Sequence, residues 1–147
     1  AENIMLLDDG DLGLLDFQDA LIGHPAYDLV SLLQDARRDV APALEAAMFD
    51  RYVAAAGIDD AAGFRAAYEI LGAQRNTKIL GVFTRLWKRD NKPAYLHLLP
   101  RVWAHLEKDL AHPLLRPLQL WLNRYVPADY RGAIAVRHNS QELALTA

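Results

Sequence analysis

The sequence predicts an α+β fold that is mostly α, in which one β-hairpin precedes a helical subdomain. Two short apolar runs, residues 4–7 and 12–15, flank the turn sequence Asp8-Asp9-Gly10-Asp11, a pattern typical of a hairpin. From Pro25 onward, apolar residues recur at helical spacing between Pro and Gly boundaries. The 147 residues, 52% of them hydrophobic and 24% charged, fit one globular domain of ordinary size.

Each helix is expected between recognisable start and stop residues. Pro25 favours a helix start, Gly57 a helix end, and Asp59 or Asp60 can cap the helix that follows. A bend is expected at Pro100. The expected helices are 26–38, 42–56, 60–88, 93–112 and 113–125. We therefore expect a domain over 1–126, with its hairpin at 3–16 and its helical subdomain at 25–125, and a loosely ordered tail at 127–147.

The composition excludes several classes of protein. There are no cysteines, so disulfides, thiolate metal sites and cysteine nucleophiles are absent. The net charge of −3 gives no global attraction for nucleic acid. The apolar runs are shorter than the ~20 residues that span a bilayer, and the first residues do not have the pattern of a signal peptide. We expect a cytoplasmic protein with no nucleic-acid or membrane partner.

The open end of the hairpin carries two oxygen-bearing side chains. If Asp9-Gly10 form a two-residue turn, Leu7 pairs with Leu12 and the pairing runs back to place Asn3 opposite Asp16. An amide oxygen and a carboxylate so placed can bind one hard cation such as Mg²⁺. The alternative is that both are ordinary residues at strand ends.

Three motifs in order give the chain a family resemblance. They are Glu2-Asn3-Ile4-Met5, then Leu15-Asp16-Phe17-Gln18-Asp19-Ala20, then Tyr27-Asp28-Leu29. Their order and spacing resemble the aminoglycoside-phosphotransferase family, a variant of the kinase catalytic loop and its metal-binding Asp. The second motif is especially similar to the bacterial branch that phosphorylates N-acetylmuramate and N-acetylglucosamine. The resemblance continues through 29–36 and 74–78 and covers nearly all of the chain before the last twenty or so residues.

This resemblance implies the C-terminal lobe of a kinase-like fold that uses ATP and Mg²⁺. Asp16 matches the main magnesium ligand and Asn3 the second. Asp28 matches an aspartate that hydrogen-bonds the catalytic-loop backbone, although it could simply favour the dipole at a helix start. The catalytic Asp should lie five positions before Asn3, which is upstream of Ala1. The N-terminal lobe should also lie upstream of Ala1. We therefore expect no catalytic residue in this chain, and no activity from the chain alone.

Four further residues are candidates for substrate binding. Gln18 and Asp19 follow the metal ligand and can face the acceptor, or equally bond the adjacent turn. Arg75 and Lys78 lie on one predicted helix face with Arg85 and Arg89, and can contact substrate or phosphate. The alternative for these basic residues is an ordinary solvated face.

The expected function is therefore phosphoryl transfer from ATP to a small-molecule hydroxyl. The basic helix favours a neutral or acidic acceptor, and so an amino sugar over a polycationic aminoglycoside or another small alcohol. A non-catalytic binding domain derived from a kinase is the other alternative. The expected partners are the nucleotide, the small-molecule substrate and the missing N-terminal lobe. Because loss of the N-terminal lobe would expose apolar hairpin surface, association between copies also stays open.

Overall fold

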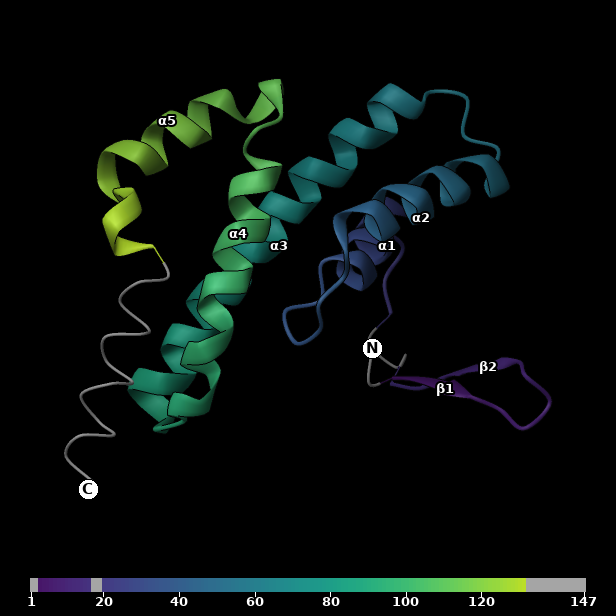
Figure 1. The fold of residues 1–147 in the computed structure, drawn as a ribbon, viewed down its shortest axis with the longest axis horizontal. Helices are drawn as coiled ribbons and strands as arrows, with labels where there is room; N and C mark the ends of the chain where they lie inside the picture. Colours follow the sequence, from purple (N-terminus) through teal and green to yellow (C-terminus); the bar gives the residue numbers. More distant parts are fainter. Residues whose placement is uncertain (1–2, 17–19, 132–147) are drawn as a thin grey trace.

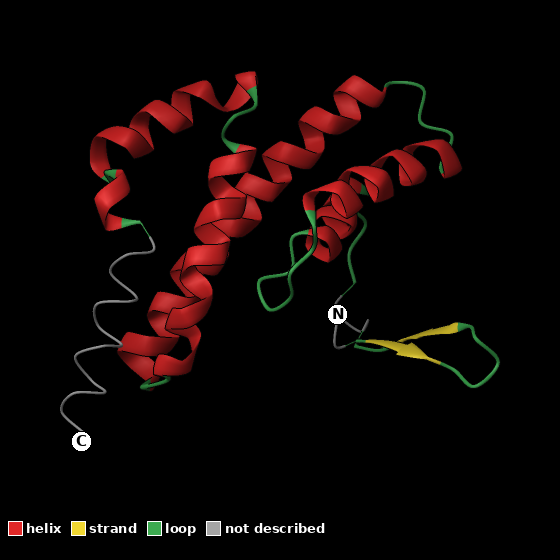
Figure 2. Cartoon of the chain, in the orientation of Figure 1, coloured by secondary structure: helices red, strands yellow, loops and turns green. Residues whose placement is uncertain are grey.

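A computed structural model describes residues 3–16 and 20–131. The chain begins with a two-stranded hairpin, and all its remaining regular structure is helical within those ranges (Figures 1 and 2). The predicted fold class is confirmed. The hairpin projects away from the helices, and the long helix α3 forms the axis on which the others pack (Figure 1).

The hairpin pairs in a register one residue away from the predicted one. Strands β1, Ile4–Leu6, and β2, Leu12–Leu14, are antiparallel, with Met5 opposite Gly13. The turn is a three-residue loop over 8–10, closed by Leu7 N–H donating to the Asp11 carbonyl at 2.9 Å. The predicted pairing of Leu7 with Leu12 is therefore wrong.

The backbone of the loop explains the shift in register. A two-residue type I′ turn needs a left-handed backbone at both central residues, whereas in this loop Gly10 alone adopts one, with φ +88°. Asp9 instead accepts a hydrogen bond from Asp11 N–H through its side chain at 3.0 Å. Asn3 consequently lies opposite Leu15, whose N–H donates to the Asn3 carbonyl at 2.9 Å.

Most helix boundaries follow the predicted signals. Gly57, with φ +63°, follows α2, and Asp60 caps α3 by accepting a hydrogen bond from Gly63 N–H at 2.8 Å. Among the described residues, the α-helices are α1 Ala26–Leu33, α2 Pro42–Ala55, α3 Ala61–Asp90, α4 Leu99–Asp109 and α5 Arg116–Tyr125. Short 3₁₀ helices join or follow them: η1 Pro93–Leu98, η2 Pro113–Leu115 and η3 Ala128–Tyr130.

Two boundary predictions were wrong. The first helix ends at Leu33 rather than at 38, because Gln34 leaves the helical conformation (φ −113°, ψ 49°) and its side chain is buried. The helix expected over 93–112 is divided into η1 and α4. Pro100 does not bend a longer helix but occupies the first turn of α4. Backbone N–H groups in the first turn have no acceptor within the helix, so a proline costs no hydrogen bond there.

Helix α3 connects three apolar clusters into one core. Its first half packs Phe64 and Tyr68 against α1 and α2, its middle packs Ala73 against α4 and α5, and its last part packs Phe83 against η1 and α4. In contrast, the leucines of the hairpin are largely exposed, with Leu6 75% accessible. Within 3–16 and 20–131, no helix is both long and apolar enough to cross a membrane.

Gly72 tests how closely α3 and α4 pack. A Cβ at Gly72 would lie 2.7 Å from Asp109 Oδ2, whereas one at Gly81, on the same helix, would meet nothing within 4 Å. We expect Gly72→Ala to lower the free energy of unfolding by about 1–3 kcal/mol because of this overlap. Gly81→Ala is the matched control and should raise it by up to about 1 kcal/mol through helix propensity alone. Chemical denaturation of both variants measures the difference, and equal effects would contradict the close approach.

Candidate functional site

Asn3 and Asp16 meet at the open end of the hairpin. Asn3 Nδ2 donates a hydrogen bond to Asp16 Oδ2 at 3.0 Å, and both residues are exposed. The sequence analysis places these two residues together as opposed strand partners. The structure brings them together by a different route, because the strand partner of Asn3 is Leu15.

The backbone of Asp16 makes this contact possible. Asn3 and Leu15 are directly opposed, so their side chains belong to the same face of the hairpin, and in a regular strand Asp16 would point to the other face. Asp16 instead has φ +61°, a left-handed conformation that costs an ordinary L-residue roughly 1 kcal/mol and that Asp tolerates better than most. This break in the alternation returns the carboxylate to the face of Asn3.

The pair suits a hard cation. Mg²⁺ takes one or two oxygen ligands from a protein and the remainder from phosphate and water. Asp16 offers its carboxylate directly, whereas Asn3 presents its Nδ2 and has to rotate its amide to offer Oδ1. In the described part of the chain, no group of three or more His, Cys, Asp or Glu side chains forms a metal cage. A two-ligand site that is completed by phosphate oxygens is therefore the arrangement these residues fit.

His24, just before α1, contacts both α1 and α3. Its Nδ1 accepts a hydrogen bond from Ala26 N–H at 3.2 Å, and its ring lies 5.6 Å from that of Phe64 on α3. The start of α1 is thereby fixed against α3, on the C-terminal side of the hairpin.

For three of the predicted site residues, the expected roles stay predictions. Asp28 is exposed in the first turn of α1, where a carboxylate is favourable next to the helix dipole. Its expected bond to a catalytic-loop backbone stays a prediction. Gln18 and Asp19 lie outside the described residues.

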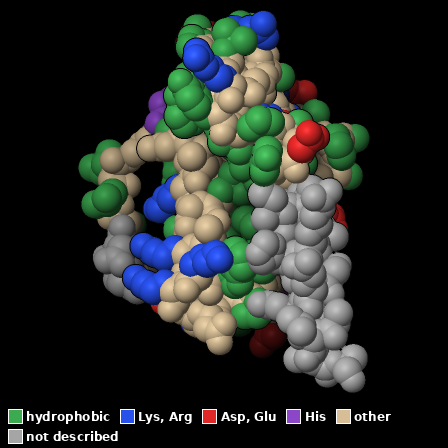
Figure 3. All heavy atoms as spheres, turned by 90° about the vertical axis from the view of Figure 1, so that its left-hand side faces the viewer, with side chains coloured by type: hydrophobic (Ala, Val, Ile, Leu, Met, Phe, Trp, Pro, Cys, Tyr) green, Lys and Arg blue, Asp and Glu red, His purple; other side chains and the backbone are tan. Residues whose placement is uncertain are grey.

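Arg75 and Lys78 have different environments although both lie on α3. Arg75 is partly buried, and its Nη1 donates to the carbonyl of Gln34, directly after α1, at 3.1 Å. Burial lowers the pKa of Arg75, while the nearby Tyr27 and Asp35 oppose that shift. Lys78 is exposed, as are Arg85 and Arg89 further along the helix. Figure 3 shows Lys and Arg side chains gathered on one part of the surface that it presents. Arg75 is thus engaged within the fold, and Lys78 is accessible to a ligand.

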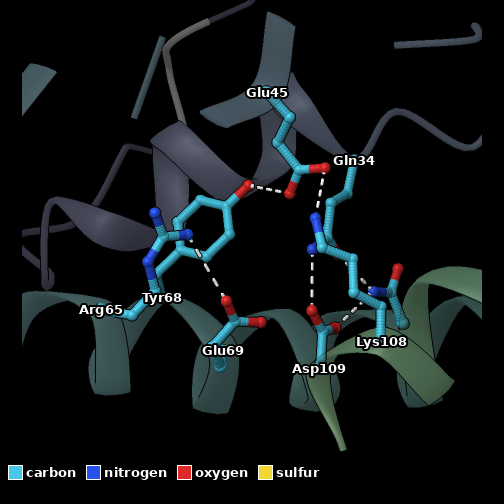
Figure 4. Close-up of polar contacts among 8 residues, drawn as sticks. Gln34, Glu45, Arg65, Tyr68, Glu69, Lys108 and Asp109 are labelled. Carbon is cyan, nitrogen blue, oxygen red and sulfur yellow. Dashed lines mark hydrogen bonds and ion pairs between the residues drawn. The ribbon is translucent and has the colours of Figure 1, made fainter. Parts of the chain in front are cut away.

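A buried polar cluster beside Arg75 was not predicted (Figure 4). Asp109 of α4 accepts hydrogen bonds from Gln34 Nε2 at 2.7 Å and from Asn76 Nδ2 at 2.9 Å, and Asn76 also donates to Gln34 Oε1 at 2.7 Å. All three side chains are at most 1% exposed. The one sequence signal for it was a charged residue, Asp109, placed between the core positions Leu106 and Leu110.

A second buried carboxylate joins α2 to this region. Glu45 accepts a hydrogen bond from the Tyr68 hydroxyl at 2.8 Å and pairs with Lys108 Nζ at 2.5 Å. Burial favours the neutral form of Glu45, but its bonds to Lys108 and Tyr68 outweigh burial and lower its pKa. Burial and the same carboxylate raise the pKa of Tyr68. Glu45 is therefore a buried anion with its own cation.

Comparison of the sequence with known proteins shows that it is similar to phosphotransferases. Residues 1–70 match the model of the phosphotransferase enzyme family. The chain is 48% identical over 135 residues to an N-acetylmuramate/N-acetylglucosamine kinase of Caulobacter vibrioides, covering 89% of this chain and 37% of that protein. Kinases of the same name from Neisseria meningitidis and Pseudomonas aeruginosa are 39% and 36% identical over 71% and 73% of this chain, and 33% of each is covered. The chain thus spans about a third of the length of the curated relatives it matches.

The stability of Arg75 and Lys78 variants tests whether Arg75 supports the fold while Lys78 is only exposed. We expect Arg75→Ala to lower the free energy of unfolding by about 1–3 kcal/mol, because the Gln34 carbonyl loses its charged donor in a partly buried setting. Lys78→Ala, three residues along the same helix, should change stability by no more than about 0.5 kcal/mol. Thermal and denaturant unfolding of the two variants provide the measurement. A stable Arg75→Ala variant would mean that the bond to Gln34 contributes nothing to the fold.

Proposed function

Since residues 1–70 of this chain belong to the phosphotransferase enzyme family, we propose that the chain is the C-terminal part of a phosphotransferase. The enzyme would depend on ATP and Mg²⁺ and act on a small-molecule hydroxyl. The contact between Asn3 and Asp16 is the observation that carries the proposal, because it unites the two residues that match the magnesium ligands of the family.

The pair would act by holding the metal at the phosphates of the nucleotide. Magnesium, when bound, neutralises charge that develops on the transferring phosphoryl group. Asp16 supplies an anionic oxygen, and the Asn3 amide, once rotated, supplies a neutral one on the same face of the hairpin. The hydrogen bond between them keeps the two side chains together before the metal binds, and rotation of the Asn3 amide then replaces this bond with contacts to the metal.

An amino sugar is the acceptor that we propose. The kinases of Caulobacter, Neisseria and Pseudomonas to which the chain is similar are named for N-acetylmuramate and N-acetylglucosamine. Lys78, Arg85 and Arg89 are exposed along α3, and a basic surface suits a neutral or acidic sugar better than a polycationic aminoglycoside.

The chain would contribute metal and substrate binding to a longer protein. We expect the residue that orients the acceptor hydroxyl to be an Asp in the part of the protein that precedes Asn3, together with the lobe that covers the nucleotide. The chain by itself is then inactive, and the intact enzyme works in the cytoplasm, where ATP is available.

A phosphoryl-transfer assay tests the proposal on the chain joined to its natural upstream sequence. ATP and Mg²⁺ would be supplied with N-acetylmuramate, N-acetylglucosamine and a panel of aminoglycosides. We expect transfer to an amino sugar, and a roughly 100-fold or larger loss of kcat in Asp16→Asn because one oxygen of the metal site is replaced by an amide. Asp8→Asn, at the exposed tip of the same hairpin, is the matched control and should keep full activity.

Each other outcome rejects a specific part of the proposal. Transfer to aminoglycosides alone would reject the amino-sugar acceptor but keep the enzyme class. Full activity in Asp16→Asn would reject the metal site. Neither transfer nor binding of ATP would favour a non-catalytic binding domain.

A further inference from the structure

Three residues of α3 form a narrow polar stripe that receives Asp109 of α4. Glu69, Gly72 and Asn76 follow one another at helical spacing and so share one face of α3. Gly72 leaves room for the Asp109 carboxyl, which would lie 2.7 Å from a Cβ at that position. Asp109 is fully buried there and accepts hydrogen bonds from Gln34 and Asn76, one on each oxygen.

The neighbouring carboxyl of Glu69 has an oxygen without a hydrogen-bond donor. Glu69 Oε1 lies 3.5 Å from Arg65 Nη1, a long contact, while Oε2 is buried and has no hydrogen-bond partner among the described residues. In Figure 4, the Glu69 and Asp109 carboxyls lie side by side between α3 and α4, and they are close enough to hydrogen-bond once one is protonated. A neighbouring carboxylate, with no cation between the two, disfavours the ionised form of the buried Asp109.

The charged groups around the pair do not supply that cation. Lys108, from α4, is held by Glu45 of α2 at 2.5 Å. From α3, Arg75 bonds the Gln34 carbonyl. Arg65 pairs with Glu69 through Oε1 alone, at 3.5 Å, and also lies over the ring of Phe49, 3.2 Å from its centroid, so that Glu69 Oε2 is left without a partner. The remaining titratable groups that face this region are Tyr68 of α3, whose hydroxyl donates to Glu45, and His105 of α4. None of these groups donates a hydrogen bond to Glu69 Oε2.

We propose that Asp109 carries a proton directed at Glu69 Oε2 and that this proton is a pH-sensitive lock between α3, α4 and the end of α1. The protonated Asp109 donates to Glu69 Oε2 while its two oxygens still accept from Gln34 and Asn76. Loss of the proton leaves two adjacent buried negative charges, and the cheapest relief is separation of α4 from α3. Gln34 is bound to Asp109, so the end of α1 loosens at the same time.

The direction of the pH dependence follows from the pair. Burial raises the pKa of Asp109 from 3.8 to about 8, assisted by Glu69 and opposed by the amide donors. A carboxyl whose pKa is raised on folding gives its full stabilisation below its unfolded pKa and loses it as the pH rises through the folded value. The lock therefore weakens between about pH 4 and pH 8. His105 acts in the opposite direction, since burial lowers its pKa. The stability that it contributes is lost as the pH falls below 6.5, its ordinary pKa.

Asp109→Asn isolates the pair from these other groups. An amide in place of the carboxyl can donate to Glu69 Oε2 without titrating, and it still offers an oxygen to Gln34. We expect the Tm of the chain to fall as the pH is raised from 6 to 9, and the Tm of the variant to fall by several degrees less over the same range. Asp50→Asn, an exposed change on α2, is the matched control and should retain the slope of the unmodified chain.

Two further measurements keep the proposal falsifiable if the variant is unstable. Glu69→Gln should flatten the same slope, because a donor then faces Asp109 without a second charge. Infrared spectroscopy of the unmodified chain should show the carbonyl stretch of a protonated carboxyl at pH 6 and its loss by pH 9. A slope unchanged in Asp109→Asn or in Glu69→Gln, or an infrared spectrum with ionised carboxylates alone at pH 6, would overturn it.

Discussion

The helical part of the molecule depends on the burial of one carboxyl, that of Asp109, against the backbone of α3 at Gly72. A buried polar group is tolerated only when its hydrogen bonds are made inside the protein, and each neighbouring element supplies part of that requirement. Gln34 contributes an amide from the end of α1, and Asn76 contributes one from α3. The mutual arrangement of three helices is thus fixed by directional bonds as well as by apolar packing.

This requirement also explains where α1 stops. Gln34 has to turn out of the helix to send its side chain to Asp109, and its carbonyl is then free to accept from Arg75. The basic residue that the sequence marks as a substrate contact therefore completes a helix end. Lys78, one turn further along α3, has no such constraint and is accessible to a ligand.

A different local constraint forms the Asn3–Asp16 pair. The left-handed backbone of Asp16 is unfavourable for most residues and is typical of positions where a side chain has to be aimed. Further along the chain, His24 is tied to the start of α1 and to α3. The apolar strands of the hairpin are themselves left exposed.

The sequence by itself determined the fold class, the helix end at Gly57, a cap at Asp59 or Asp60, and the identity of the residues at the open end of the hairpin. These features depend on neighbours in the chain: a turn sequence, helical spacing, and a motif with fixed intervals. Even the family resemblance could be recognised from three short stretches in order.

Only the tertiary structure decided the register of the hairpin, the left-handed turn of Asp16 and the buried cluster around Asp109. The register changed because the same turn sequence can form a two-residue or a three-residue loop, and no spacing rule decides between the two. Asp109, Asn76 and Gln34 are far apart in the chain, and polar residues are normally read as surface. Their burial becomes favourable only when three helices bring complementary donors and acceptors to one point, and that is a property of the packed molecule alone.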